Sequence, residues 1–280
     1  MTQAKAPALG QWANAPLVFV LAQVRFLPVA GVGPENIRDA ITARLGQRFT
    51  SIVEATQVGF QINMEGQAGV VTGQTSVAGY DMLATDMQSM VRVTRDSVSY
   101  ATTTYLNSTL FFTNWMEILK ALPAVGIKTV NRVGMRYVDF IIPAQGHEPE
   151  DYVCPPWDAR NMPKLPGANK GPSLLVHMMD VPFPEGMMRL QFMKGFGVPS
   201  LPADLQGMLP PANSQTQNEP GWCGIIDTDR WVDAEVPSTE EQLRVSYKTI
   251  HAELSQAFQL MITPFAREVW NPTSNIGNTP

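Results

Sequence analysis

The stretch "NRVGMRYVDF", residues 131–140, has the composition of a β-strand and yet carries charge on both of its faces. Side chains alternate between the two faces of a strand. Arg132 and Arg136 therefore share one face, and Tyr137 and Asp139 share the other. Such a strand fits neither a plain core position nor a plain surface position, so the strands beside it must account for the charges.

Further strands are predicted on either side of this stretch. In residues 57–65, Val58, Phe60 and Ile62 alternate with polar residues, which is the pattern of a half-buried antiparallel strand. Residues 91–104 indicate a hairpin that turns at residues 94–97. The other predicted strands cover residues 17–26, 72–83, 131–142, 173–183, 186–196 and 222–233.

Three amphipathic helices accompany these strands. Pro34 begins the first helix, which is expected to end near residues 46–49. Ser108 is the expected N-cap of the second. The third is long and C-terminal: Ser238 and Glu241 form a capping box at its start, and Pro264 bends or ends it.

Both halves of the chain run from a strand through antiparallel strands to an amphipathic helix, which indicates a tandem duplication. We expect an α+β fold of two tandem, pseudo-symmetric antiparallel-sheet units, with helices packed on one face and a long C-terminal helix. This divides the chain into a flexible arm (1–14), a first α+β repeat (15–130), a second α+β repeat (131–271) and a tail (272–280). The long polar loop over residues 197–221 is expected to be mobile.

Four motifs follow one another in a recognisable order: "APLVFVLAQVRF", "TRDSVSYATTTY", "TNWMEIL" and "NRVGMRYVDF". Together, over most of residues 15–142, they resemble a sporadically distributed family of uncharacterised bacterial and archaeal proteins. That family has a "PPLVE…RF"-like opening strand, an "RD-x-V-x-Y" hairpin, a Trp-containing helix and an "R-x-G-L-R-Y-x-N" strand. Phe19 stands where an acidic residue is common, and Asp139 where Asn is usual. The resemblance implies no established activity; such proteins often belong to mobile or defence-related gene neighbourhoods.

The composition narrows the classes of partner. The net charge of −5 supplies no global basic field, so no duplex nucleic acid is expected as a partner. The apolar run at residues 17–22 is too short to span a bilayer, so no membrane association is expected. Two cysteines, Cys154 and Cys223, lie far apart without metal or redox spacing, and the prediction is a cytoplasmic protein.

Catalytic motifs are not found. The sequence has no phosphate-binding loop, nucleophile elbow or H-E-x-x-H motif, and we predict no cofactor and no catalytic residue. Asp227 and Asp229 share a strand face, a spacing that can hold Mg²⁺, and they are weak candidates for a metal site. The other interpretation is a solvated strand end in which Arg230 pairs locally.

If the strands at residues 17–26 and 131–142 are equivalent members of the two repeats, they lie near a pseudo-twofold axis. Arg25, Arg132 and Arg136 would then project toward one surface, facing Asp139 or the acidic strand; these four residues are called the seam. Two interpretations stay open: a salt-bridge network that joins the halves, or a polar floor that binds an anionic ligand or a partner segment.

The leading functional hypothesis is a non-enzymatic binding protein that engages a protein partner or associates with itself. The second is a carrier or sensor of a small apolar ligand between the sheet and the last helix, with Met178, Met188 and Phe192 in its pocket. The third is a metal-assisted hydrolase or nuclease that uses Asp227 and Asp229.

Overall fold

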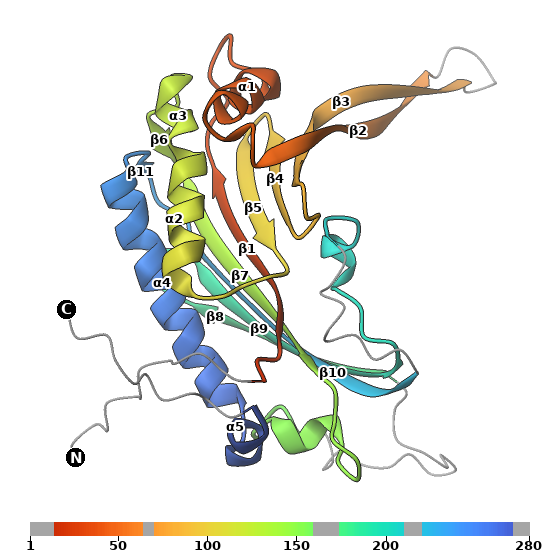
Figure 1. The fold of residues 1–280 in the computed structure, drawn as a ribbon. Helices are drawn as coiled ribbons and strands as arrows, with labels where there is room; N and C mark the ends of the chain where they lie inside the picture. Colours follow the sequence, from red (N-terminus) through yellow and green to blue (C-terminus); the bar gives the residue numbers. More distant parts are fainter. Residues whose placement is uncertain (1–13, 64–69, 159–173, 210–219, 271–280) are drawn as a thin grey trace.

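The structure is a computed structural model that describes residues 14–63, 70–158, 174–209 and 220–270, with no side-chain description for residues 56–76 (Figure 1). The predicted arm, apart from Asn14, and the predicted tail lie outside the described residues, as does the inward face expected for Val58, Phe60 and Ile62.

One large antiparallel sheet organises the molecule, so the α+β class is confirmed. A small second sheet pairs β6 (Thr129–Val130) with β11 (Val236–Pro237). Across the large sheet the nine strands lie in the order β2 (Phe49–Asn63), β3 (Val70–Ala84), β4 (Ser89–Thr94), β5 (Ser97–Thr102), β1 (Leu17–Arg25), β7 (Arg132–Ile141), β10 (Gly221–Val232), β9 (Met187–Gly197) and β8 (Leu174–Pro182).

The strand that opened the sequence analysis, β7, lies at the centre of the sheet. It pairs with β1 on one side and with β10 on the other. Directly opposite residues share a face, and the register places Arg25 opposite Arg132 and Leu21 opposite Arg136. Arg25, Arg132 and Arg136 therefore lie on one face of the sheet.

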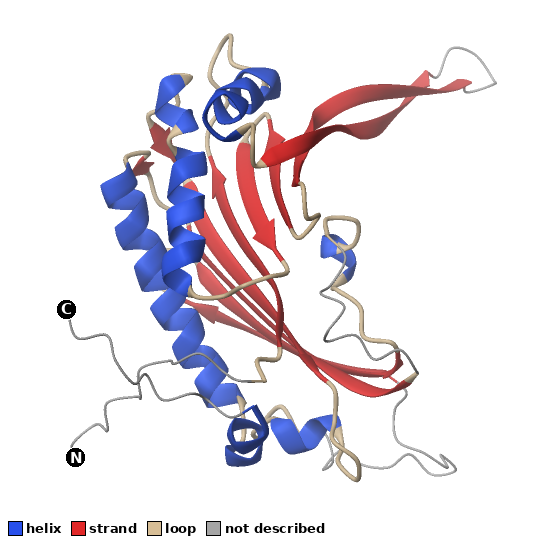
Figure 2. Cartoon of the chain, viewed as in Figure 1, coloured by secondary structure: helices blue, strands red, loops and turns tan. Residues whose placement is uncertain are grey.

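Helices cover one face of this sheet, here called the helix face (Figures 1 and 2). On it α2 (Ser108–Leu119) and α4 (Glu240–Met261) lie side by side, and Trp115 and Tyr247 contact each other edge to face. The other helical elements in the described residues are α1 (Pro34–Leu45), α3 (Ala121–Ala124), α5 (Pro264–Trp270) and the 3₁₀ turns η1 (Pro149–Tyr152) and η3 (Ala203–Leu205). No helix among the described residues is long and apolar enough to span a bilayer.

Two expected helix caps are wrong by one residue. The N-cap of α2 is Asn107, whose side chain accepts a hydrogen bond from the Leu110 amide at 2.8 Å. The N-cap of α4 is Thr239, whereas the Ser238 hydroxyl donates to the Ile127 carbonyl at 2.7 Å. The sequence predicted that Pro264 either bends or ends the long helix. In the structure α4 ends at Met261 and Pro264 begins the separate helix α5.

The opposite face of the sheet, here called the open face, carries a second and smaller core. Residues 198–209, here called the covering segment, lie across it on the side away from the helices (Figure 1). Four of its side chains are buried against Val18, Phe19 and Phe140: Leu201, Leu205, Met208 and Leu209. Burial of these apolar side chains anchors residues 198–209 to the sheet; residues 210–219 of the loop that is expected to be mobile lie outside the described chain.

Candidate ligand site on the open face

A row of alternating charges crosses the open face. The strand register aligns Arg136 on β7, Asp229 on β10, Arg189 on β9 and Asp180 on β8. Side chains in register on adjacent strands lie close enough to pair. The charges on this face of β7 thus belong to a ladder that runs to the edge of the sheet.

Arg136 is the most heavily bonded member of this row. It donates to both carboxylate oxygens of Asp227 at 2.8 and 2.7 Å, and to Asp204 of the covering segment at 2.5 and 3.2 Å. Burial lowers the pKa of Arg136, but the hydrogen bonds to the two carboxylates outweigh burial and raise it. One guanidinium therefore joins the sheet to the segment that covers it.

Within the described chain, Asp229 has no such partner. Its two cross-strand neighbours are both arginines, but Arg136 is bonded as above and Arg189 donates twice to Asp180, at 2.8 and 2.9 Å. Within the described chain Asp229 accepts no hydrogen bond. Burial raises its pKa to about 6, the charges of Arg136 and Arg189 lower it, and those of Asp227 and Asp204 raise it.

A cavity of about 300 Å³ opens beside Asp229. Its floor includes Leu21, Gln23, Gly134, Arg136 and Trp231 of β1, β7 and β10, and the covering segment contributes Asp204, Leu205 and Met208. Arg92, Ser99, Arg132 and Met135 complete the lining. The cavity thus lies where the central strand pair, β10 and the covering segment meet.

The other arginines of the cavity are paired as well. Arg92 donates to both oxygens of Asp81 at 2.7 and 2.8 Å. Arg132 donates to Asp233 at 2.5 Å, and its guanidinium lies 5.6 Å from the centre of a ring of Trp231. Among the ionisable side chains that line the cavity in the described chain, Asp229 alone has no ion-pair partner within bonding distance.

The structure separates the four seam residues. Arg132 and Arg136 line the cavity, and Arg25 lies on the same face but is exposed and pairs with Asp96 at 3.3 Å. Asp139 lies on the helix face, because it is an odd number of residues from both Arg132 and Arg136 along β7. It does not face the arginines: that part of the expectation is wrong, whereas the expected contact with the acidic strand is present in Arg136 and Asp227.

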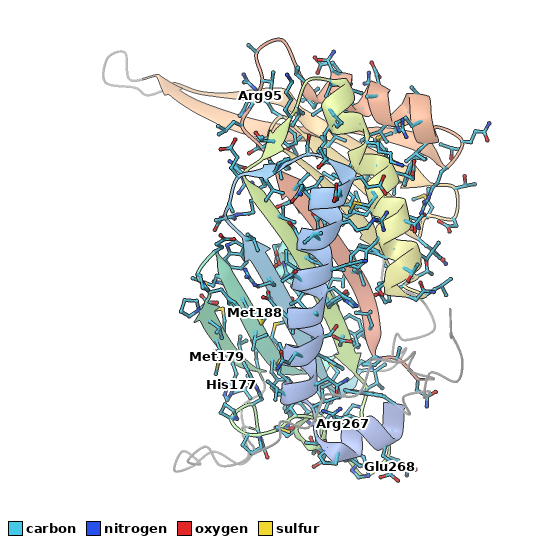
Figure 3. All side chains as sticks on the ribbon, turned by 90° about the vertical axis from the view of Figure 1, so that its left-hand side faces the viewer. Arg95, His177, Met179, Met188, Arg267 and Glu268 are labelled. Atoms are coloured by element: carbon cyan, nitrogen blue, oxygen red, sulfur yellow. The ribbon has the colours of Figure 1, made fainter. Side chains whose placement is uncertain are left out.

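The three residues expected in an apolar pocket do not share one. Met188 and Phe192 are buried in the main core on the helix face, whereas Met178 is 57% exposed on the open face, opposite Gln191. Figure 3, viewed from the helix side, shows Met188 on β9 and Met179 and His177 on β8. Alternation along β8 separates Met178 from this group.

The weak metal candidates lie on one face, as the spacing indicated, but they are not equivalent. Both oxygens of Asp227 accept hydrogen bonds from Arg136, whereas Asp229 accepts none from the residues that the structure describes. Nowhere in the described residues do three or more His, Cys, Asp or Glu side chains gather in a group that could hold a metal ion.

Sequence reasoning missed the partners that complete the ladder. Arg189 and Asp180 lie on the predicted strands 186–196 and 173–183, and their pairing could have been found had the strand register been known. Asp204 lies in a segment without periodicity, and no signal in the sequence points to its contact with Arg136.

Comparison of the sequence with models of protein families and with curated proteins gave no match. Membership of the family that the motifs resemble therefore stays a prediction.

Proposed function

We propose that the protein is a non-enzymatic binding protein that holds a small ligand in the cavity between the open face of the sheet and the covering segment. The observation that carries this proposal is Asp229, a partly buried carboxylate that accepts no hydrogen bond within the described chain and faces a cavity of about 300 Å³. Partial burial of a charge that has no hydrogen-bond partner costs free energy. Such a cost is expected at a site that a ligand completes.

The lining favours binding over catalysis. Its arginines are held in ion pairs, and the Ser99 hydroxyl accepts a hydrogen bond from Gln23 at 2.9 Å. A nucleophile or general base is usually activated by a neighbouring group within hydrogen-bonding reach. In the described lining the other carboxylate, Asp204, is bound to Arg136, and no His, Cys or Lys is present.

We also infer that the two halves of the chain are tandem copies of one unit. In support, the last strand of each half returns to pair with its first strand: β5 with β1, and β10 with β7. Each half then continues into a helix on the same face, α2 or α4. On this proposal the cavity lies at the junction of the copies, because Gln23 belongs to one and Gly134 to the other.

The proposed function can be tested by filling the cavity without changing its charge. Gly134 faces the cavity, and a Cβ at this position would meet only ordinary contacts, the nearest being Trp231 Cβ at 3.4 Å. Gly134→Leu should therefore fold and occupy the ligand space. Gly195→Leu is the matched control, because a Cβ there would meet only the end of Leu174, outside the cavity.

Native mass spectrometry of the protein, purified gently from its own host, is the measurement. We expect an added small-molecule mass on the wild type and on Gly195→Leu, and its loss from Gly134→Leu. The same added mass on Gly134→Leu, or none on the wild type, would count against the proposal.

A protein partner or self-association is a second candidate, favoured by the edge strand β8. In the described chain β8 pairs only with β9, so its other edge presents unpaired backbone groups. Leu174, Val176 and Met178 on the open face of β8 are 66%, 49% and 57% exposed. An apolar edge strand of this kind is a template for pairing with another strand.

The experiment for this second candidate places a charge on the edge. Val176→Lys should convert a dimer to a monomer in light scattering coupled to size exclusion. Val245→Lys, on the exposed side of α4 (58% exposed), should leave the mass unchanged. A wild-type monomer at every concentration tested would argue against self-association through β8.

A further inference from the structure

We propose that the cavity on the open face binds a small organic cation, a primary ammonium or guanidinium group on an apolar body, with Asp229 as its counter-ion. This inference rests on the proposed function and names the chemical class of its ligand.

The charge balance excludes the anionic ligand that the arginines alone would suggest. Around the cavity and along the ladder, four guanidinium groups meet six carboxylates. The former are Arg92, Arg132, Arg136 and Arg189, and the latter are Asp81, Asp180, Asp204, Asp227, Asp229 and Asp233. An anion would have to displace one of these carboxylates from its arginine, whereas a cation needs only the vacant oxygens of Asp229.

The two arginines beside Asp229 cannot easily turn to it. Arg136 would have to abandon Asp227, whose side chain is 4% exposed, and would leave a buried charge unpaired. Arg189 is held by a bidentate pair with Asp180. Geometry therefore keeps Asp229 available to a group that enters from the cavity.

The remaining lining sets the character of the rest of the ligand. Leu21 on the floor and Leu205 and Met208 on the covering segment are apolar. A ligand body with apolar surface would displace water from these side chains. A fully polar polyamine would gain nothing from them, so the ligand class is an amine or guanidine with one compact apolar portion.

A pH dependence follows from the groups that face Asp229. These are Arg136 on β7, Asp227 on β10, Arg189 on β9 and Asp204 on the covering segment. Burial raises the pKa of Asp229 to about 6. Lowering the pH through this value neutralises the counter-ion, while the arginines around it keep their positive charge. The affinity for a cation should fall below pH 6, by at most about tenfold per pH unit.

Isothermal titration calorimetry with three probes of matched shape tests the charge preference: phenethylamine, 2-phenylethanol and phenylacetate. We expect phenethylamine to bind the wild-type protein at least about tenfold more tightly than 2-phenylethanol, because a charge-assisted hydrogen bond is stronger than a neutral one. Asp229→Asn should remove this preference. Asp96→Asn, which deletes a carboxylate paired with Arg25 outside the cavity, should keep it.

The outcomes separate this inference from the function on which it rests. If 2-phenylethanol or phenylacetate binds as tightly as phenethylamine and Gly134→Leu abolishes binding, the cavity is a ligand site but the cationic class is wrong. If phenethylamine binds equally well to Asp229→Asn, Asp229 is not the counter-ion. If none of the three probes binds the wild-type protein, both the inference and the proposed function are contradicted.

Discussion

Asp139 is a carboxyl group in the core of the molecule, 4% exposed on the helix face of β7. Burial, and then the charge of Asp227, raise its pKa to about 8. The group therefore keeps its proton at neutral pH and resembles an amide in shape and polarity. The family that the sequence resembles usually has Asn at this position, so the exchange between the two residues is chemically small.

This protonation predicts how stability depends on pH. Between pH 4 and pH 8 the unfolded chain releases the proton of Asp139 while the native state retains it, so the free energy of unfolding falls as pH rises, by up to about 1.4 kcal/mol per pH unit. Asp139→Asn should remove this contribution and gain stability over the wild type as pH approaches 8. Urea unfolding across this range measures it.

The control for this prediction is Glu268→Gln, which neutralises an exposed carboxyl on α5 (Figure 3). It should leave the pH profile unchanged. If the difference in unfolding free energy between Asp139→Asn and the wild type stays constant from pH 4 to pH 8, Asp139 is ionised in the native protein and the account of it is wrong.

Arg136 and its two carboxylates differ in what they contribute. Asp227 has 4% of its side chain exposed, whereas Asp204 has 64% exposed. Arg136→Ala should destabilise the protein by about 3–5 kcal/mol, because it leaves Asp227 buried and unpaired. Asp204→Asn should cost about 1 kcal/mol or less, because its pair is largely in water. Equal losses in chemical denaturation would show that Arg136 acts through the covering segment and not through Asp227.

At the scale of elements, most strands and all three amphipathic helices were predictable, because each carries its own periodicity. The hairpin at residues 94–97 is confirmed by β4 and β5, and the last helix by α4. Helix starts were less certain. Neighbouring Asn and Ser, or Ser and Thr, have similar capping propensities, and only the backbone geometry selects one of them.

The corrected cap of α2 can be tested directly. Asn107→Ala removes the acceptor for the Leu110 amide and should destabilise the protein by about 1 kcal/mol. Ser108→Ala, one residue further, should change the stability by a few tenths of a kcal/mol at most, because helix propensity alone is affected. Thermal or urea unfolding of the two variants distinguishes the caps; a larger loss in Ser108→Ala would restore the original prediction.

The candidate site was predictable only in part. The period of a strand places Arg132 and Arg136 on one face, and the adjacency of β1 and β7 adds Gln23 and Arg25. The ladder also requires the register between β7, β10, β9 and β8. Packing in the folded sheet sets this register, which cannot be predicted from the sequence of any single strand. The covering segment reaches the cavity through Leu205 and Met208, two of its four buried apolar residues, and these four have no periodicity that would identify the segment from the sequence.

Across the whole molecule, the two faces of the sheet differ in composition and structural role. The helix face holds the main apolar core beneath α2 and α4, whereas the open face combines a small core with the charged ladder and the cavity. A sheet whose stability comes from one face can bear unsatisfied charge on the other. The loss of stability that the unpaired Asp229 causes is then confined to the open face.

This division predicts a trade between stability and binding. Asp229→Asn removes the ionised carboxylate from a partly buried position and should stabilise the ligand-free protein by on the order of 1 kcal/mol at pH 7. The same variant should lose the preference for phenethylamine. A variant less stable than the wild type would indicate that Asp229 already has a stabilising partner.

The ionisation of Asp229 itself is the most direct test of the account. A ¹³C NMR titration of the side-chain carboxyl groups, with the Asp229 signal assigned by its absence in Asp229→Asn, follows this ionisation with and without phenethylamine. The account predicts a pKa of about 6 in the free protein and a lower value when the amine is bound. An ordinary aspartate pKa, about 3.9, that the amine leaves unchanged would contradict it.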